Sequence, residues 1–188
     1  MKALRKDKLE SEQSIRNIKA ERDILIKITQ DKPHFINHMK FNFESLERIF
    51  FVTPFMKSGE LKTHIKMIHA AYSTGMSSNA TRHIIAQVCV AIQFLHDNNI
   101  LFGDMKPENV LMDEDGYVAI TDFGVSTIFK EDEVKEKEGL DGTLEYMAPE
   151  ICTKPHIHGF PVDIWAIGVT AFEMLTGISP FSGTSEVQ

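Results

Sequence analysis

The stretch that decides the fold holds three short motifs. It reads I-L-F-G-D-M-K-P-E-N-V-L at residues 100–111, I-T-D-F-G at 120–124 and G-T-L-E-Y-M-A-P-E at 142–150. Alone, D-F-G is a three-letter pattern that chance supplies often. The ordered set D-x-K-P-E-N, D-F-G and A-P-E is far more specific, and a Glu-Asp-Gly turn signal at 114–116 separates the first two motifs. The stretch therefore predicts a polar loop, a strand–turn–strand hairpin and a second polar loop.

This ordered set resembles the eukaryotic-type serine/threonine protein kinase domain, and the resemblance covers residues 1–188. It implies a two-lobed α+β fold with a reduced N-lobe sheet at 1–56 and an incomplete helical C-lobe at 57–188. The K-P-E-N sequence, and Thr143 ahead of A-P-E, point to Ser and Thr rather than Tyr as acceptors. The segments K-A-E-R-D-I-L and S-G-E-L suggest an AGC-like branch.

The resemblance also assigns the chemistry. Phosphoryl transfer needs a group that accepts the proton of the attacking hydroxyl and cations that offset phosphate charge. By resemblance, Asp104 is the proton acceptor and Lys106 is a cation beside the transferred group. Asn109 and Asp122 are assigned as Mg²⁺ ligands, because that ion prefers oxygen donors. An isolated Asp or Asn in such a loop more often caps a turn, but the ordered set favours the catalytic interpretation.

One carboxylate stands out in the N-terminal third. Helical spacing places Glu21 on the apolar stripe of an amphipathic helix predicted at 11–30, together with Ile15. A buried carboxylate is costly unless a cation meets it, so the alternatives are a rotated helix or a paired Glu21. The segment M-K-A-L resembles the end of the strand that carries the phosphate lysine in kinases. Lys2 is therefore the predicted partner, against the alternative of an ordinary lysine in a charged N-terminus.

The resemblance places other groups around ATP. Thr53 resembles the gatekeeper, and Pro54 and Met56 resemble the hinge, where the Pro54 carbonyl and the Met56 N–H would meet adenine. Glu60 resembles the residue that reaches the ribose, and in basophilic kinases a substrate arginine. An apolar column linking the lobes is assigned to Leu25, Met39, Phe102 and Phe123. The implied cofactors are ATP and Mg²⁺, and the implied partner is a protein substrate bearing Ser or Thr.

Hydrophobic periodicity and turn signals predict the other elements. They are strands at 35–43 and 48–56 around a turn at 44–47, a linker at 57–60, a helix at 78–96, hairpin strands at 109–113 and 117–121, a loop at 130–142, and a helix at 162–176. The last helix is apolar nearly all round, which predicts full burial. At its start, Asp163 is expected to accept backbone N–H bonds from the catalytic loop.

Composition excludes several function classes. The net charge of −7 carries no basic surplus for nucleic acid or acidic lipid. No apolar run approaches the roughly 20 residues that span a bilayer, and the charged N-terminus is not a signal peptide. Cys89 and Cys152 are predicted to be buried free thiols in a reducing compartment. We expect an intracellular, cytoplasmic protein without nucleic-acid or membrane partners; the sequence does not indicate the oligomeric state.

Several departures from the kinase pattern shape the expected activity. The sequence starts at the phosphate lysine and ends soon after the apolar helix, so we expect a domain truncated at both ends and weak turnover. Gly103 replaces the arginine that grips an activation-loop phosphate, and residues 128–142 contain no Ser, Thr or Tyr. Glu150 of A-P-E has no arginine after Arg82 to pair with. The alternative function is a catalytically impaired kinase fragment or pseudokinase that binds nucleotide or protein.

Overall fold

The computed structural model describes residues 1–8, 12–129, 135–136 and 142–181 of the 188-residue chain. The helices are α1 (Glu12–Asp31), α2 (Leu61–Tyr72), α3 (Ser78–Asp97), α4 (Pro149–Cys152) and α5 (Pro161–Thr176), with 3-10 turns η1 (Lys6–Lys8), η2 (Pro107–Asn109) and η3 (Leu144–Tyr146). The strands are β1 (Lys2–Arg5), β2 (Phe41–Glu44), β3 (Arg48–Val52), β4 (Gly59–Glu60), β5 (Ile100–Leu101), β6 (Val110–Met112), β7 (Val118–Ile120), β8 (Thr127–Ile128), β9 (Lys135–Glu136) and β10 (Ile157–His158).

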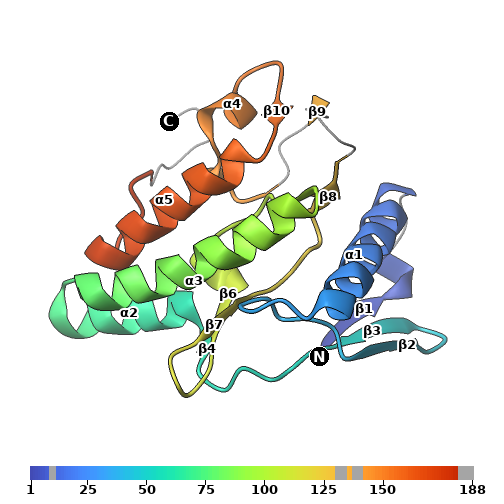
Figure 1. The fold of residues 1–188 in the computed structure, drawn as a ribbon, viewed down its shortest axis with the longest axis horizontal. Coiled ribbons are helices and arrows are strands. Elements are labelled where there is room, and N and C mark those ends of the chain that lie inside the picture. The colour runs from blue at the N-terminus through green and yellow to red at the C-terminus, as the bar shows by residue number, and fades with distance from the viewer. Residues whose placement is uncertain (9–11, 130–134, 137–141, 182–188) are drawn as a thin grey trace.

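These elements form two groups that lie side by side (Figure 1). One group is α1 with the antiparallel sheet β1-β3-β2, in which Lys2 lies opposite Phe51. The other group is built on α2, α3 and α5 with the short strands around the β6–β7 hairpin. The two-group arrangement agrees with the predicted two-lobed fold, and the helix predicted at 11–30 is confirmed as α1.

Most of the strand predicted at residues 35–43 is wrong. Only its last residues, from Phe41 onward, pair with β3. Before them, Phe35 has a φ of 62°, which an extended strand cannot contain, and Ile36 instead forms an isolated parallel bridge to Ile120 of β7. The apolar side chains at 35–39 serve contacts between the two groups rather than one sheet, so their pattern imitates a strand. The second predicted strand is confirmed but ends at Val52.

The helical group follows the sequence more closely. α3 starts where expected, because the Ser77 hydroxyl accepts the backbone N–H of Ala80 at 3.2 Å. The β6–β7 hairpin is confirmed, with Met112 opposite Val118. Residues 57–60, predicted as a linker, instead end in β4, which pairs with β6. α2 was not predicted, although its buried Leu61 and Ile65 stand at the i, i+4 spacing of a helix.

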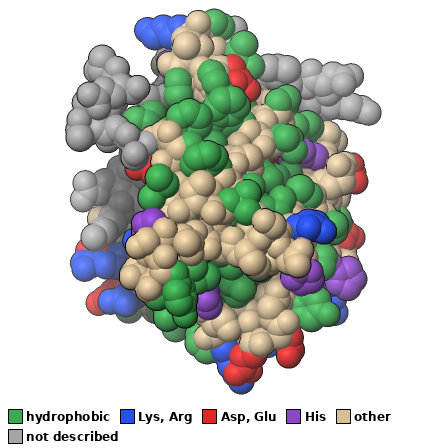
Figure 2. All heavy atoms as spheres, turned by 90° about the vertical axis from the view of Figure 1, so that its left-hand side faces the viewer, with side chains coloured by type: hydrophobic (Ala, Val, Ile, Leu, Met, Phe, Trp, Pro, Cys, Tyr) green, Lys and Arg blue, Asp and Glu red, His purple; other side chains and the backbone are tan. Residues whose placement is uncertain are grey.

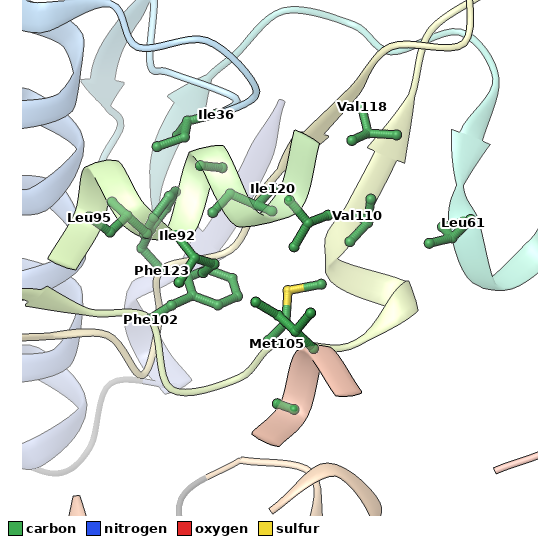
Figure 3. Packing of buried hydrophobic residues seen from close by; sticks show 14 of the residues in the cluster. Ile36, Leu61, Ile92, Leu95, Phe102, Met105, Val110, Val118, Ile120 and Phe123 are labelled. Atoms are coloured by element: carbon green, nitrogen blue, oxygen red, sulfur yellow. The ribbon is translucent and has the colours of Figure 1, made fainter. Parts of the chain in front are cut away.

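One hydrophobic core runs through both groups. The four residues assigned to the apolar column, Leu25, Met39, Phe102 and Phe123, are all buried in this cluster. Ordinary core residues would be buried in the same way, so the column itself stays a prediction. The rings of Phe102 and Phe123 meet edge to face, with centroids 5.5 Å apart. Figure 3 shows them in one packed group with residues of α3 and the β6–β7 hairpin. The loop before the β6–β7 hairpin and the loop after it are thus held together by the contact between Phe102 and Phe123.

The prediction that the 162–176 helix is fully buried is wrong. Ile164, Trp165, Phe172 and Leu175 of α5 are 58%, 38%, 44% and 47% exposed. Packing against α2 and α3 covers only one side of α5 among the described residues, so the apolar residues on its other side face outward. Figure 2 views the molecule from the side where α2 and α5 end, and shows hydrophobic side chains gathered on this face.

Cys89 and Cys152 are free thiols, as predicted, but the prediction that they are buried is wrong, since both are exposed. Cys89 follows the fully buried Val88 on α3, and one residue turns a helix by about 100°, which carries the thiol off the buried stripe. Cys152 ends the short helix α4. Within the described parts of the chain, no helix is long and apolar enough to cross a membrane.

Candidate active site

The loop after β5 is held by a buried carboxylate from α5. Asp163 is 1% exposed, and its two oxygens accept the backbone N–H groups of Phe102 and Gly103 at 3.0 and 2.8 Å. His96 of α3 contacts the same carboxylate at 2.8 Å. Gly103 has a φ of 81°, a left-handed conformation that glycine adopts without steric cost. The prediction for Asp163 is confirmed, and the residue just before Asp104 is fixed rather than loose.

Asp104 lies at the centre of a dense polar network. Lys106 donates to its Oδ2 at 2.6 Å, and the backbone N–H and hydroxyl of Thr143 both lie 3.2 Å from its Oδ1. Lys106 also donates to the Thr143 hydroxyl at 2.7 Å. The amide of Asn109 donates to the Asp104 backbone carbonyl at 2.8 Å and to Oδ2 at 3.0 Å. The carboxylate is thereby oriented by groups from two separate loops.

Across the site, one lysine joins three elements. The Lys2 ammonium at the start of β1 lies 2.8 Å from Glu21 of α1 and 2.9 Å from Asp122 in the loop after β7. Glu21 is only 3% exposed, so the predicted pairing of Glu21 with Lys2 is confirmed and the rotated-helix alternative is wrong. Asp122 has a φ of 68°, a strained conformation for a residue with a side chain.

Burial and pairing shift the pKa values of this trio in different directions. Burial raises the pKa of Glu21, and the nearby ammonium only partly opposes that rise. For Lys2, burial acts to lower the pKa, but the charges and hydrogen bonds of Glu21 and Asp122 outweigh it and raise the pKa. For Asp122, burial acts to raise the pKa, but its contacts with Lys2 outweigh it and lower the pKa. Lys2 therefore stays charged at neutral pH.

These groups surround a cavity of about 440 Å³ between the two halves of the molecule. The residues lining it are Lys2, Glu21, Leu25, Asn37, Phe51, Thr53, Glu60, Lys106, Glu108, Asn109, Leu111, Thr121, Asp122 and Phe123. Thr53, the predicted gatekeeper, lines this cavity, whereas neither predicted hinge residue does. Pro54 and Met56 lie beyond it, on the segment joining β3 to β4. Their contact with adenine stays a prediction.

The donor set suits Mg²⁺. The amide nitrogen of Asn109 faces Asp104, which leaves its Oδ1 without a hydrogen bond among the described residues. Asp122 uses Oδ1 for Lys2 and for the Gly124 N–H at 3.2 Å, and its Oδ2 makes no hydrogen bond within that part of the chain. The amide oxygen of Asn109 and the carboxylate oxygen of Asp122, from two residues that line the same cavity, are the kind of donor that Mg²⁺ prefers.

The whole chain, residues 1–188, matches the protein kinase domain family. The chain belongs to that family. This kinase domain is 39% identical over 98% of its length to the serine/threonine-protein kinase AtPK2/AtPK19 of Arabidopsis thaliana, of which it spans 37%. It is 37% identical over 97% of its length to the putative ribosomal protein S6 kinase alpha-2 of Caenorhabditis elegans, spanning 23% of it. The serine/threonine kinase SCH9 of Saccharomyces cerevisiae is 35% identical over 96% of the kinase domain, which spans 21% of that relative.

The kinase domain thus spans well under half of the length of each of these relatives. The names of these relatives agree with the serine/threonine and AGC-like assignment that was made from the motifs.

The contact between Thr143 and Asp104 was not predicted, because Thr143 was used only to infer that the acceptor is Ser or Thr. Its position just ahead of A-P-E was the feature of the sequence that could have indicated the contact. Ile15 is 42% exposed, so its assignment to the buried stripe of α1 is wrong. Most of the predicted loop at 130–142 lies outside the described residues.

Proposed function

We propose that this kinase domain catalyses Mg²⁺-dependent transfer of the γ-phosphoryl group of ATP to Ser or Thr hydroxyls of proteins. The observation that carries the proposal is the position of Asp104. Its carboxylate is oriented by Lys106, Thr143 and Asn109, and two of these, Lys106 and Asn109, also line the cavity that holds Lys2 and Asp122. The proposed phosphate-binding and Mg²⁺-binding groups therefore line one cavity, and two of them contact the proposed proton acceptor directly.

The residues supply the parts that phosphoryl transfer requires. Asp104 accepts the proton of the substrate hydroxyl, whose oxygen bonds to the γ-phosphorus as the bond to the β–γ bridging oxygen breaks and ADP leaves. Lys106 offsets negative charge on the transferred group, and Lys2 is placed to hold the other phosphates. Asn109 and Asp122 would hold Mg²⁺, which would supply positive charge to neutralise the phosphate oxygens.

The pseudokinase alternative is not favoured by the site. Asp104, Lys106, Asn109 and Asp122 are all present, and three of them take part in the hydrogen-bond network around the Asp104 carboxylate. A binding module that never transfers phosphate would not need a proton acceptor held from two loops. An intracellular, cytoplasmic location belongs to the same proposal.

The test uses residues 1–188, thermal melting with and without Mg-ATP, and phosphate transfer to paired Ser and Tyr peptides. We expect Mg-ATP to raise the melting temperature and the Ser peptide to be the better acceptor. Asp104→Asn should lower turnover by about 10²–10⁴-fold while the nucleotide-induced shift remains. Asp115→Asn, on the exposed hairpin turn, is the matched control. Nucleotide stabilisation with no turnover in the wild-type chain would favour the pseudokinase alternative.

A further inference from the structure

A second buried cluster of charges lies beside the catalytic loop. The Lys62 ammonium of α2 is 2.6 Å from the Glu173 carboxylate of α5, 3.4 Å from Glu108 of η2, and 3.1 Å from the Tyr146 hydroxyl of η3. Tyr146 donates to the other oxygen of Glu173 at 2.5 Å. The side chains of Lys62 and Glu173 are 16% and 4% exposed. Nothing in the proposed transfer step uses this cluster.

The cluster holds one uncompensated negative charge. Burial acts to lower the pKa of Lys62, but Glu173 and Glu108 outweigh it and raise the pKa, so Lys62 is cationic. Burial and the Glu173 carboxylate raise the pKa of Tyr146, so the phenol is neutral. One ammonium thus faces two carboxylates. Lys62 donates hydrogen bonds to Glu173 and Tyr146 and makes a longer ion pair with Glu108 Oε1. Glu108 Oε2 is buried without a hydrogen-bond partner among the described residues.

Two members of the cluster reach the proposed active site, since Glu108 lines the cavity together with Lys106 and Tyr146 lies in a hollow beside Asp104. Glu108 is two residues beyond Lys106, which contacts Asp104 directly. On the other side, Tyr146 is three residues beyond Thr143, which also contacts Asp104. Asp104, Thr143 and Tyr146 line one small hollow together. If Asp104 accepts the substrate proton, as the proposed function has it, residues flanking the acceptor Ser or Thr pass close to Glu108 and Glu173.

We propose that Lys62 is a specificity-determining residue that occupies the acidic pair Glu108–Glu173 and keeps it from binding a cationic side chain of the substrate. The ammonium takes the place that a substrate arginine or lysine would take between the two carboxylates. The Glu108–Glu173 pair therefore contributes little selection for basic residues next to the acceptor in the native chain. Removal of the Lys62 charge opens the pair and creates that selection.

The experiment measures peptide binding, so that it does not depend on turnover. The probes are fluorescein-labelled serine peptides that carry arginine or alanine at one of the three positions on either side of the serine. Their affinities are measured by anisotropy for the wild-type chain, Lys62→Met, Lys62→Arg and Lys66→Met. Lys66 lies one turn further along α2 and is exposed, so it is the matched control.

For three of the proteins, namely the wild type, Lys62→Arg and Lys66→Met, the dissociation constants of the arginine and alanine peptides should agree within about twofold. Lys62→Met should bind the arginine peptide about tenfold more tightly at one position at least, because a charge-assisted hydrogen bond to a carboxylate replaces the internal one. Lys62→Met that binds the two peptides equally, or binds neither, overturns the proposal. Lost turnover with a retained affinity change would instead contradict the proposed function alone.

Lys62→Met leaves Glu173 buried without its cation, which can unfold the chain. The double variant Lys62→Met/Glu173→Gln avoids this, because the neutral amide still accepts from Tyr146 and Glu108 remains free. It should prefer the arginine peptide about fivefold, through Glu108 alone. A folded double variant with no preference also overturns the proposal and leaves Lys62 as a purely structural tie between α2 and α5.

Discussion

The two walls of the active site are built in different ways. On the helical wall, Asp104 is oriented by Lys106, Thr143 and Asn109, and the residue before it is fixed by the buried Asp163. The Asp104 carboxylate thus has three partner residues, and the Asp163 carboxylate also has three, namely Phe102, Gly103 and His96. On the other wall, Lys2 stands at the edge of a three-stranded sheet, and its position depends on two carboxylates alone.

This difference indicates how each wall should respond to damage. A network with shared partners keeps its geometry when one contact is lost, because neighbouring hydrogen bonds still define it. A single cation between two carboxylates has no such reserve, and its loss also leaves Glu21 buried without a partner. Asp104, the proposed proton acceptor, should therefore keep its position when one contact is lost, whereas Lys2, the proposed phosphate-binding group, should not.

Substitution of the lysine is the severest test of this contrast. We expect Lys2→Met to lower turnover by about 10²–10³-fold, since a preorganised cation at the phosphates is lost, and to abolish stabilisation by Mg-ATP. Glu21→Gln keeps the shape of the side chain and removes only its charge, so it should reduce both turnover and the stabilisation by Mg-ATP less than Lys2→Met does. Steady-state kinetics and melting curves measure these effects. A milder loss in Lys2→Met than in Glu21→Gln would show that Lys2 is not the phosphate-binding group.

The helical wall can be challenged at Asp163. Asp163→Asn replaces an acceptor of two backbone N–H groups by an amide that can satisfy only one of them. We expect the free energy of unfolding to fall by about 2–3 kcal/mol and turnover to fall less than in Lys2→Met, because the Asp104 contacts remain. Urea denaturation measures the stability, with Asp115→Asn as the exposed control. A turnover loss beyond that of Lys2→Met would reverse the order of the two walls.

The pH dependence of stability isolates the Lys2 contacts. The pKa of Lys2 is raised above its ordinary value of 10.5, so its contribution is complete below that pH and is lost as the pH rises through the folded-state value. The pKa of Asp122 is lowered below 3.8, so its contribution is present above that pH and is lost as the pH falls through the folded-state value. In Lys2→Met, the pKa of Glu21, already raised by burial, loses the ammonium that opposes the rise, so Glu21 takes up its proton at a higher pH than in the wild type. The stability difference between wild type and Lys2→Met should therefore fall as the pH falls through the pKa of Glu21, and fall again as the pH rises through the folded-state pKa of Lys2. A difference that does not fall on acidification would assign the effect to other groups.

The smallest effect is expected from phosphatase treatment. Gly103 offers no guanidinium to an activation-loop phosphate, and residues 128–142 contain no hydroxyl side chain. Turnover should therefore be unchanged after treatment, as measured on chain produced in eukaryotic cells. Ser126, Thr127 and Thr143 lie outside that stretch and need separate mapping by mass spectrometry. A loss of turnover that tracks a phosphate on another residue would locate a different control point.

The sequence predicted which polar residues come together better than it predicted which side chains are buried. Asp104, Lys106, Asn109 and Asp122 follow from local motifs, and Glu21 follows from a carboxylate on an apolar stripe, so no long-range information was needed. The cluster around Lys62 joins four elements far apart in the chain, and no spacing rule reveals it. Burial was misjudged for α5 and for the cysteines, because periodicity shows which residues share a face but not which faces another element covers.

The exposed cysteines have a practical consequence. The pKa of the Cys89 thiol is raised by partial burial, whereas Cys152 lies at the open end of α4. Thiolate is the reactive form, so at neutral pH a limiting amount of maleimide should label Cys152 before Cys89. A donor dye on Cys152 and an acceptor dye on Cys89 would then report the distance between α4 and α3 by resonance energy transfer. With it, docking of a peptide beside Asp104 can be followed in single molecules without introducing a cysteine.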